Sequence, residues 1–206
     1  MKAEEKPVLT ETFSADKYLI NIIRRAVSNS QNILIDRPQH GHITVLANDG
    51  EYFAEVEHMP TFCSLAANEF KVTVLNEKKL QSYRTGIGRN IDELLWQAGY
   101  HASGGRLMQG SNWNDVVKLN RWPNFTRLPT TPNSLRIAAL LAAQPTTIEY
   151  TILSLKIKRD EVYRFYCAAR CSGALSTVNE TAKEPVLKPH RSNALISLLL
   201  SKIASI

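Results

Sequence analysis

Residues 131–175 read TPNSLRIAALLAAQPTTIEYTILSLKIKRDEVYRFYCAARCSGAL, and they carry the strongest folding signal in the chain. Apolar residues recur at helical spacing in three successive segments of this stretch. Pro145 ends the first segment, a capping box from Thr146 to Glu149 opens the second, and Gly173 follows the third. The pattern therefore predicts three short helices, the third of which covers residues 159–172.

Three short helices with this spacing resemble the helix-turn-helix core of winged-helix domains. The phrase EVYRF at residues 161–165, running into ARCSGAL at residues 169–175, resembles the recognition-helix end of such domains. The resemblance implies a strand pair, the wing, after the third helix. Residues 175–178 could supply one strand, but the following polar residues to 188 give no second strand.

A DNA-binding transcription regulator is one functional hypothesis that follows from this resemblance. A recognition helix contacts base edges and phosphates, and basic residues in the preceding turn contact the backbone. The alternative is that the helices serve protein docking or stability alone, and Asp160 and Glu161 at the helix start suit the helix dipole without any function. The candidate DNA-binding residues are Lys156, Lys158, Arg159, Tyr163, Arg164 and Arg170, with Cys167 on the same predicted outward face.

The net charge of +6 is distributed unevenly along the chain. Residues 1–75 hold 7 Lys and Arg against 10 Asp and Glu, whereas residues 76–206 hold 18 against 9. A basic second half suits an anionic partner such as nucleic acid or a nucleotide. It is equally consistent with solvated basic side chains that have no partner.

Composition places the chain among globular proteins of the cytoplasm. Of its 206 residues 44% are hydrophobic and 21% are charged, which is ordinary for such proteins. No apolar run reaches the roughly 18 residues of a membrane span, and residues 1–7 are too charged for a secretion signal. Three cysteines, Cys63, Cys167 and Cys171, follow no disulfide spacing, which favours a reducing compartment.

The first 80 residues predict a small α/β domain. Asn48, Asp49 and Gly50 form a turn sequence between two alternating segments, which indicates a β-hairpin. The remaining segments follow from apolar periodicity and from the caps Ser14 and Pro60. The predicted elements are a helix at 14–27, strands at 32–36, 43–47, 51–56 and 70–75, and a helix at 59–68.

The rest of the chain divides into three parts. Residues 81–132 predict a helix from Asn90 to about residue 103, followed by an ordered connector rich in Gly, Asn, Pro and Trp. Residues 133–190 are expected to form the helix-turn-helix domain that the winged-helix resemblance implies. Residues 191–206 predict an amphipathic helix, whose apolar face suits docking on its own domain or pairing with a second copy in a homodimer. The predicted fold class is therefore α+β.

The string RWPNFTR at residues 121–127 suggests an anion pocket. Arginines beside an aromatic ring can hold a phosphate or a guanine base, so a cyclic or guanine nucleotide is a candidate ligand. The alternative is that Trp122 and Phe125 pin the connector while the arginines pair locally. The candidate ligand-binding residues are Arg121, Trp122, Arg127 and Arg106.

No catalytic motif is present. The chain has no nucleophile elbow, no phosphate-binding loop and no Cys/His group at zinc spacing, and His40, His42 and His58 fit surface positions. Cys167 and Cys171 lie one helical turn apart without further ligands nearby. The sequence therefore predicts a non-enzymatic protein without metal or cofactor.

Residues from about 94 to 175 also resemble a group of uncharacterised bacterial proteins from signalling gene clusters with small Ras-like GTPases and roadblock-type regulators. The resemblance is carried by LLW at 94–96, GRL at 105–107, RWPN at 121–124, TPN at 131–133 and RIAAL at 136–140. It implies an adaptor or effector with a small GTPase or its regulator as partner. The leading hypothesis is thus a bacterial signalling module that binds a protein partner or an anionic nucleotide.

Overall fold

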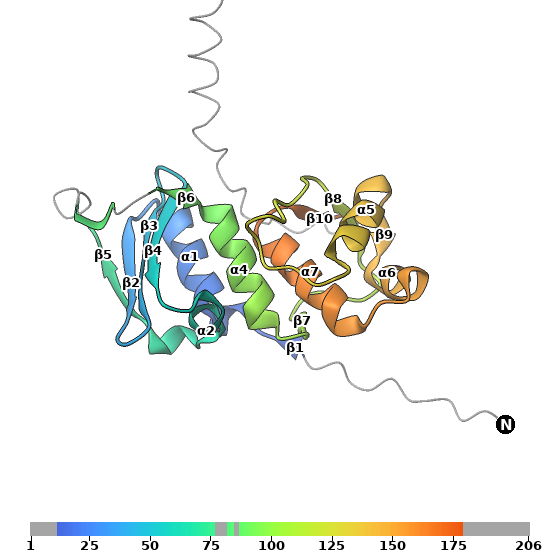
Figure 1. The fold of residues 1–206 in the computed structure, drawn as a ribbon, viewed down its shortest axis with the longest axis horizontal. Helices are drawn as coiled ribbons and strands as arrows, with labels where there is room; N and C mark the ends of the chain where they lie inside the picture. The colour runs from blue at the N-terminus through green and yellow to red at the C-terminus, as the bar shows by residue number, and fades with distance from the viewer. Residues whose placement is uncertain (1–11, 77–81, 85–86, 179–206) are drawn as a thin grey trace, which may run out of the picture.

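A computed structural model describes residues 12–76, 82–84 and 87–178 of the chain (Figure 1). It confirms the predicted α+β class. A five-stranded antiparallel sheet with helices on one face forms one part, and three helices with a three-stranded sheet form the other. A single hydrophobic core runs through both parts.

The five-stranded sheet has the order β5-β2-β3-β4-β6, so β5 and β6 lie at its edges. β3 and β4 form the predicted hairpin, and Gly50 in its turn has a φ of 71°, a left-handed conformation that favours glycine. The bounds are β2 Ile33–Arg37, β3 Gly41–Leu46, β4 Glu51–Val56, β5 Lys71–Val74 and β6 Arg89–Asn90.

Helices α1 (Leu19–Ser28), α2 (Met59–Ser64) and α4 (Ile91–Ser103) lie on one face of this sheet (Figure 1). α1 buries Leu19, Ile20, Ile23 and Ala26, the stripe expected for an amphipathic helix on a sheet. Two short 3-10 helices, η1 (Ala15–Lys17) and η2 (Ala67–Glu69), flank this layer.

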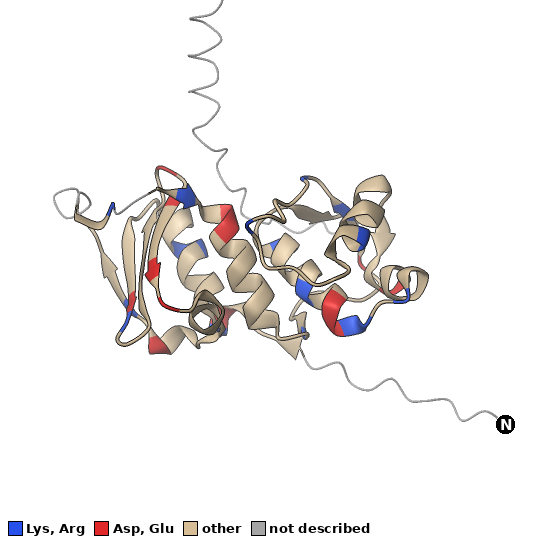
Figure 2. Ribbon diagram, viewed as in Figure 1, with Lys and Arg blue, Asp and Glu red and all other residues tan. Residues whose placement is uncertain are grey.

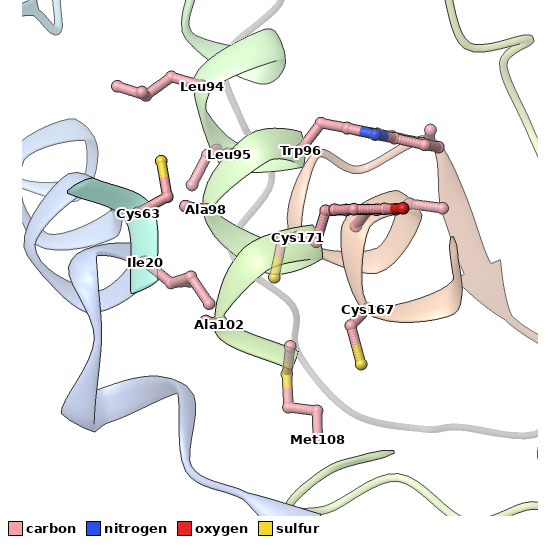
Figure 3. Packing of buried hydrophobic residues seen from close by; sticks show 14 of the residues in the cluster. Ile20, Cys63, Leu94, Leu95, Trp96, Ala98, Ala102, Met108, Cys167 and Cys171 are labelled. Carbon is pink, nitrogen blue, oxygen red and sulfur yellow. The ribbon is translucent and has the colours of Figure 1, made fainter. Parts of the chain in front are cut away.

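α4 is the central helix of the molecule. The side chain of Asn90 caps its start by accepting a hydrogen bond from the Asp92 amide at 2.8 Å, and Gly104 ends it in the left-handed conformation. Every residue of α4 is buried or half-buried. Figure 3 shows why: Ile20 of α1 and Cys63 of α2 lie on one side of the helix, and Cys167 and Cys171 lie on the other.

The second part contains the three predicted helices. Thr147 caps α6 by accepting a hydrogen bond from the Tyr150 amide at 3.0 Å, and Lys156 in the left-handed conformation ends it. α7 packs along α4, and α5 and α6 pack on α7. The bounds are α5 Ser134–Ala143, α6 Ile148–Leu155 and α7 Arg159–Cys171.

Strands from the predicted connector complete the fold. The three-stranded sheet has the order β10-β8-β9, so β8 supplies the central strand. A short parallel pair, β1 with β7, ties the start of the described chain to the end of α4. The bounds are β1 Thr12–Phe13, β7 Leu107–Met108, β8 Val116–Leu119, β9 Thr146–Thr147 and β10 Leu175–Thr177.

The local elements predicted from sequence are largely confirmed, whereas their grouping differs. The predicted boundary at residue 80 falls inside a structural unit, because β6 at residues 89–90 pairs with β4. The strand predicted at 175–178 is present as β10, but its partner β8 comes from before the three helices and not from a wing after them. The amphipathic helix predicted at 191–206 lies outside the described residues.

Candidate functional site

The two arginines of the 121–127 string are paired with the first turn of α4. The guanidinium of Arg121 lies 2.7 Å from the Asp92 carboxylate and donates a hydrogen bond to the carbonyl of Ser172 at 3.0 Å. Arg127 lies 3.5 Å from the Glu93 carboxylate. Both guanidinium groups are more than half exposed, so each pair contributes little stability. The two ion pairs neutralise the charges of both arginines. This agrees with local pairing of the arginines, which was the alternative to an anion pocket.

The predicted nucleotide pocket is therefore not assembled. Trp122 is 54% exposed, and its ring contacts Phe125 edge-on at a centroid distance of 6.2 Å. Arg106 lies at the other end of α4, where it donates to the carbonyl of Ala102 and to the hydroxyl of Tyr18, both at 3.0 Å. Thirteen helical residues, about 20 Å of helix, separate the two ends. The four residues Arg106, Arg121, Trp122 and Arg127 do not share one site.

The predicted outward face of α7 is mostly covered. Tyr163 is 1% exposed and Cys167 is fully buried, because this side of α7 packs against α4. Arg164 lies over the Tyr100 ring at 5.7 Å. Arg170 donates to the Tyr166 hydroxyl at 2.6 Å. The expectation that Tyr163 and Cys167 point outward from α7 is wrong, since both are buried, whereas Arg164 and Arg170 are half-buried.

The basic turn before α7 remains accessible. Lys156, Lys158 and Arg159 are exposed, which is the part of the predicted DNA-binding set that the structure leaves open. Acidic Asp160 follows at once and is also exposed, so the local charge is mixed (Figure 2). A turn that carries both basic and acidic side chains attracts a phosphate backbone less than a purely basic turn would.

The buried cysteines have the properties of core residues. Burial raises the pKa of the Cys63 and Cys167 thiols to about 12, so neither is a thiolate at neutral pH. Cys171 is buried beside Cys167 on α7. Within the described residues, no three His, Cys, Asp or Glu side chains lie together in a way that would hold a metal ion.

His101, near the end of α4, is held in its neutral form. Burial, together with the charges of Arg164 and His58, lowers its pKa from 6.5 to about 4. Above pH 6.5 the imidazole is neutral in both the folded and the unfolded chain, so it adds no pH dependence there. Below pH 6.5 the unfolded chain binds a proton that the folded chain excludes, and stability falls until the pH reaches about 4.

Replacing His101 by glutamine is therefore expected to remove part of the acid sensitivity. We expect the free energy of unfolding of the parent protein to fall by about 1–2 kcal/mol more than that of His101→Gln between pH 6.5 and pH 4, after allowance for partial exposure of the ring. Urea denaturation at half-unit pH steps measures this difference. Parallel stability curves for the two proteins would contradict it.

A groove lies between α1 and the edge strand β5. It has a volume of about 440 Å³. Val72 and Val74 of β5 are 44% and 60% exposed, although they face the same side of the sheet as the buried Ile35 and Ile33 opposite them on β2. The groove is lined by Asn21, Ile22, Arg25, Ala26, Asn29, Gln31, Ile33, Ala67, Asn68, Val72 and Val74.

The groove exists because the helices are narrower than the sheet. α1 covers the middle strands, and the outermost strand β5 extends beyond it (Figure 1). The outer edge of β5 has no strand partner among the described residues, so the main-chain groups along this edge face outward. Apolar side chains at alternate positions thus lie beside an open sheet edge.

Sequence reasoning identified the β5 strand but missed this site. The alternation of Val72 and Val74 was the available signal, and it predicts a strand with one apolar face. Apolar and polar residues alternate in the same way along an edge strand and a central strand. The sequence of β5 therefore does not show that β5 lies at the edge, and only the order of strands in the sheet does. The amide side chains at the rim, such as Asn21 and Asn68, carry no recognisable motif.

No protein-family model, curated protein or solved structure matches the chain. Among the helices of the described residues, none has the length and apolar character that crossing a membrane requires.

Proposed function

We propose that this protein is a non-enzymatic regulatory module of the cytoplasm that binds a partner protein in the groove between α1 and β5. The observation that carries the proposal is the pair of exposed valines, Val72 and Val74, beside an open sheet edge. The three cysteines are buried and form no disulfide, which suits a reducing compartment. A volume of about 440 Å³ lies within the range of sites that hold ligands.

The chemistry of the groove favours an extended peptide segment as the ligand. An added strand would pair its main chain with the outer edge of β5, and its alternate side chains would enter the groove over the valines. Asn21, Asn29 and Asn68 at the rim offer amide groups for further hydrogen bonds. Arg25 is exposed at the same rim and would attract an acidic residue of the ligand.

The nucleotide and DNA alternatives have less support. Arg121 and Arg127 already face carboxylates of α4, and an anion would have to compete with those carboxylates. DNA binding through α7 would require α7 to leave α4, with exposure of Tyr163 and Cys167. The resemblance to proteins of GTPase signalling clusters makes a small GTPase, or a GTPase regulator, the first candidate protein partner.

Selection from a displayed library of random peptides on the purified full chain would test the proposal. We expect selected peptides with apolar residues at alternate positions and at least one acidic residue. Fluorescence polarisation with one labelled selected peptide should then give an affinity at least about 10-fold lower for Val74→Lys, because a desolvated charge would face the apolar side chains of the peptide.

Val178→Lys is the matched control, since Val178 is 58% exposed and lies beside the other sheet. Its affinity for the same peptide should equal that of the parent protein. Hydrogen exchange provides a second readout, in which the amides of β5 become protected when the peptide binds. Equal affinities for the two lysine variants, or protection confined to the second part of the molecule, would contradict the proposed groove.

A further inference from the structure

A second apolar surface, which the other described residues leave exposed, lies on α5 and α6, at the far end of the molecule from the groove (Figure 1). Leu135, Tyr150 and Leu153 are 60%, 51% and 67% exposed. Ala139 and Ala142 are also exposed, and their spacing from Leu135 places them on the same side of α5. We call these five residues the helical face. Exposed large apolar side chains on adjacent helices often mark a surface that something covers.

The two helices that carry the helical face are in contact with each other. The guanidinium of Arg136 donates a hydrogen bond to the carbonyl of Leu155 at 3.0 Å, so the first turn of α5 lies against the end of α6. Arg136 is the single charged residue of α5, and Glu149 is the single charged residue of α6. Figure 2 accordingly shows both helices almost free of charge, which disfavours a strongly charged occupant.

The described chain ends two strands away from the start of α6, the helix that carries Tyr150 and Leu153. The amide of Val178 donates to the carbonyl of Val116 at 2.7 Å, and Val116 pairs across the sheet with Thr147, the cap of α6. Two strand spacings, about 10 Å, therefore separate the end of the described chain from the start of α6. The 13 residues from 179 to 191 could extend over about 43 Å, more than the approach to the helical face requires.

We propose that residues 192–206 of the same chain cover the helical face. Their sequence has the pattern of an amphipathic helix with one apolar stripe, and Arg191 and Lys202 are the sole charged side chains from 191 to 206. An apolar stripe with few charges matches a face with few charges. The apolar residues of the stripe are Leu195, Ile196, Leu199, Leu200 and Ile203.

The covalent linkage favours the segment of the same chain over that of a second copy. A covalent connection of 13 residues raises the effective concentration of the segment near the face, typically into the millimolar range for short linkers. A second copy would have to reach that concentration in solution to compete. The proposal therefore specifies an intramolecular contact, and it does not depend on the function proposed for the groove.

Thiol labelling of a surface cysteine tests the contact in the full chain. The three native cysteines are buried, so Leu153→Cys introduces a single accessible thiol. We expect its maleimide labelling to become at least about 10-fold faster when Leu199→Asp and Leu200→Asp are added, because charged residues on the stripe would detach the segment. The charge-matched pair Ser197→Asp and Ser201→Asp, on the opposite side of the predicted helix, should leave the rate unchanged.

Two further measurements make the outcome unambiguous. Ile87→Cys, at a residue that is 89% exposed in the first part, should label at one rate with or without the tail substitutions. Oxidation of the double variant Leu153→Cys with Leu199→Cys should give an internal disulfide and a monomer on a non-reducing gel. Equal labelling of Leu153→Cys in all backgrounds, or a disulfide-linked dimer as the main product, would overturn the proposal.

Discussion

Replacement of Trp96 by alanine is expected to lower the free energy of unfolding by about 3–5 kcal/mol, the range for removal of a large buried aromatic side chain. Trp96 is 1% exposed in the middle of α4. Its ring contacts Phe165 of α7 and Phe125 of the connector at centroid distances of 5.5 Å and 6.3 Å. Its indole N–H donates to the carbonyl of Pro129 at 3.2 Å, so the substitution also leaves that carbonyl without its donor.

Trp122→Ala is the matched control for this measurement. The same side chain is removed, but Trp122 is 54% exposed, and surface substitutions typically change stability by less than about 1 kcal/mol. Chemical denaturation followed by circular dichroism reports both values without relying on tryptophan fluorescence. Similar losses for the two variants would show that Trp96 does not hold α4, α7 and the connector together.

Substitution of Gly99 by valine should destabilise the protein by about 3 kcal/mol, the upper end of the range for overpacking a core. A Cβ atom at residue 99 would lie 2.7 Å from the carbonyl oxygen of Cys167 and 2.9 Å from the Cys171 sulfur. Helix propensity does not explain such a loss, since valine is slightly better than glycine in a helix. The loss would therefore measure the close crossing of α4 and α7.

Gly99→Ala separates the contribution of the close contact with α7 from the contribution of helix propensity. Alanine gains about 1 kcal/mol of helix propensity over glycine, yet its Cβ already makes the close contact with α7. We expect Gly99→Ala to be destabilising as well, whereas Ser154→Val on the exposed side of α6 should change stability by a few tenths of a kcal/mol. An increase in stability for Gly99→Ala would contradict the tight crossing.

Local elements were predictable from the sequence because their signals are local. The turn at residues 48–50 fixes the hairpin of β3 and β4. Asn90 and the predicted capping box at 146–149 mark helix starts that the structure confirms, with Thr147 in place of Thr146 as the cap. Each of these signals lies within a few residues of its effect. The grouping of elements was less predictable, because β6 and β8 are short and their partners lie far away in the sequence.

The candidate sites were less predictable than the elements. Val162 and Phe165 of α7 are buried, as expected for apolar residues at helical spacing. That spacing could not exclude burial of Tyr163 and Cys167, whose side chains are tolerated in a core and at a surface. The identity of the covering element, α4, depends on a tertiary crossing. The same limit applies to the groove, since no local pattern places Val74 at the edge of the sheet.

The position of α4 has a consequence for any attempt to divide the protein. The buried residues of α4 pack both against elements before it and against elements after it in the chain. Neither half of the chain therefore has a complete hydrophobic core without α4. A fragment that ends near residue 80, or one that starts near residue 133, would lack this helix altogether and leave its former neighbours in water. The smallest autonomous unit of this chain therefore includes both sheets.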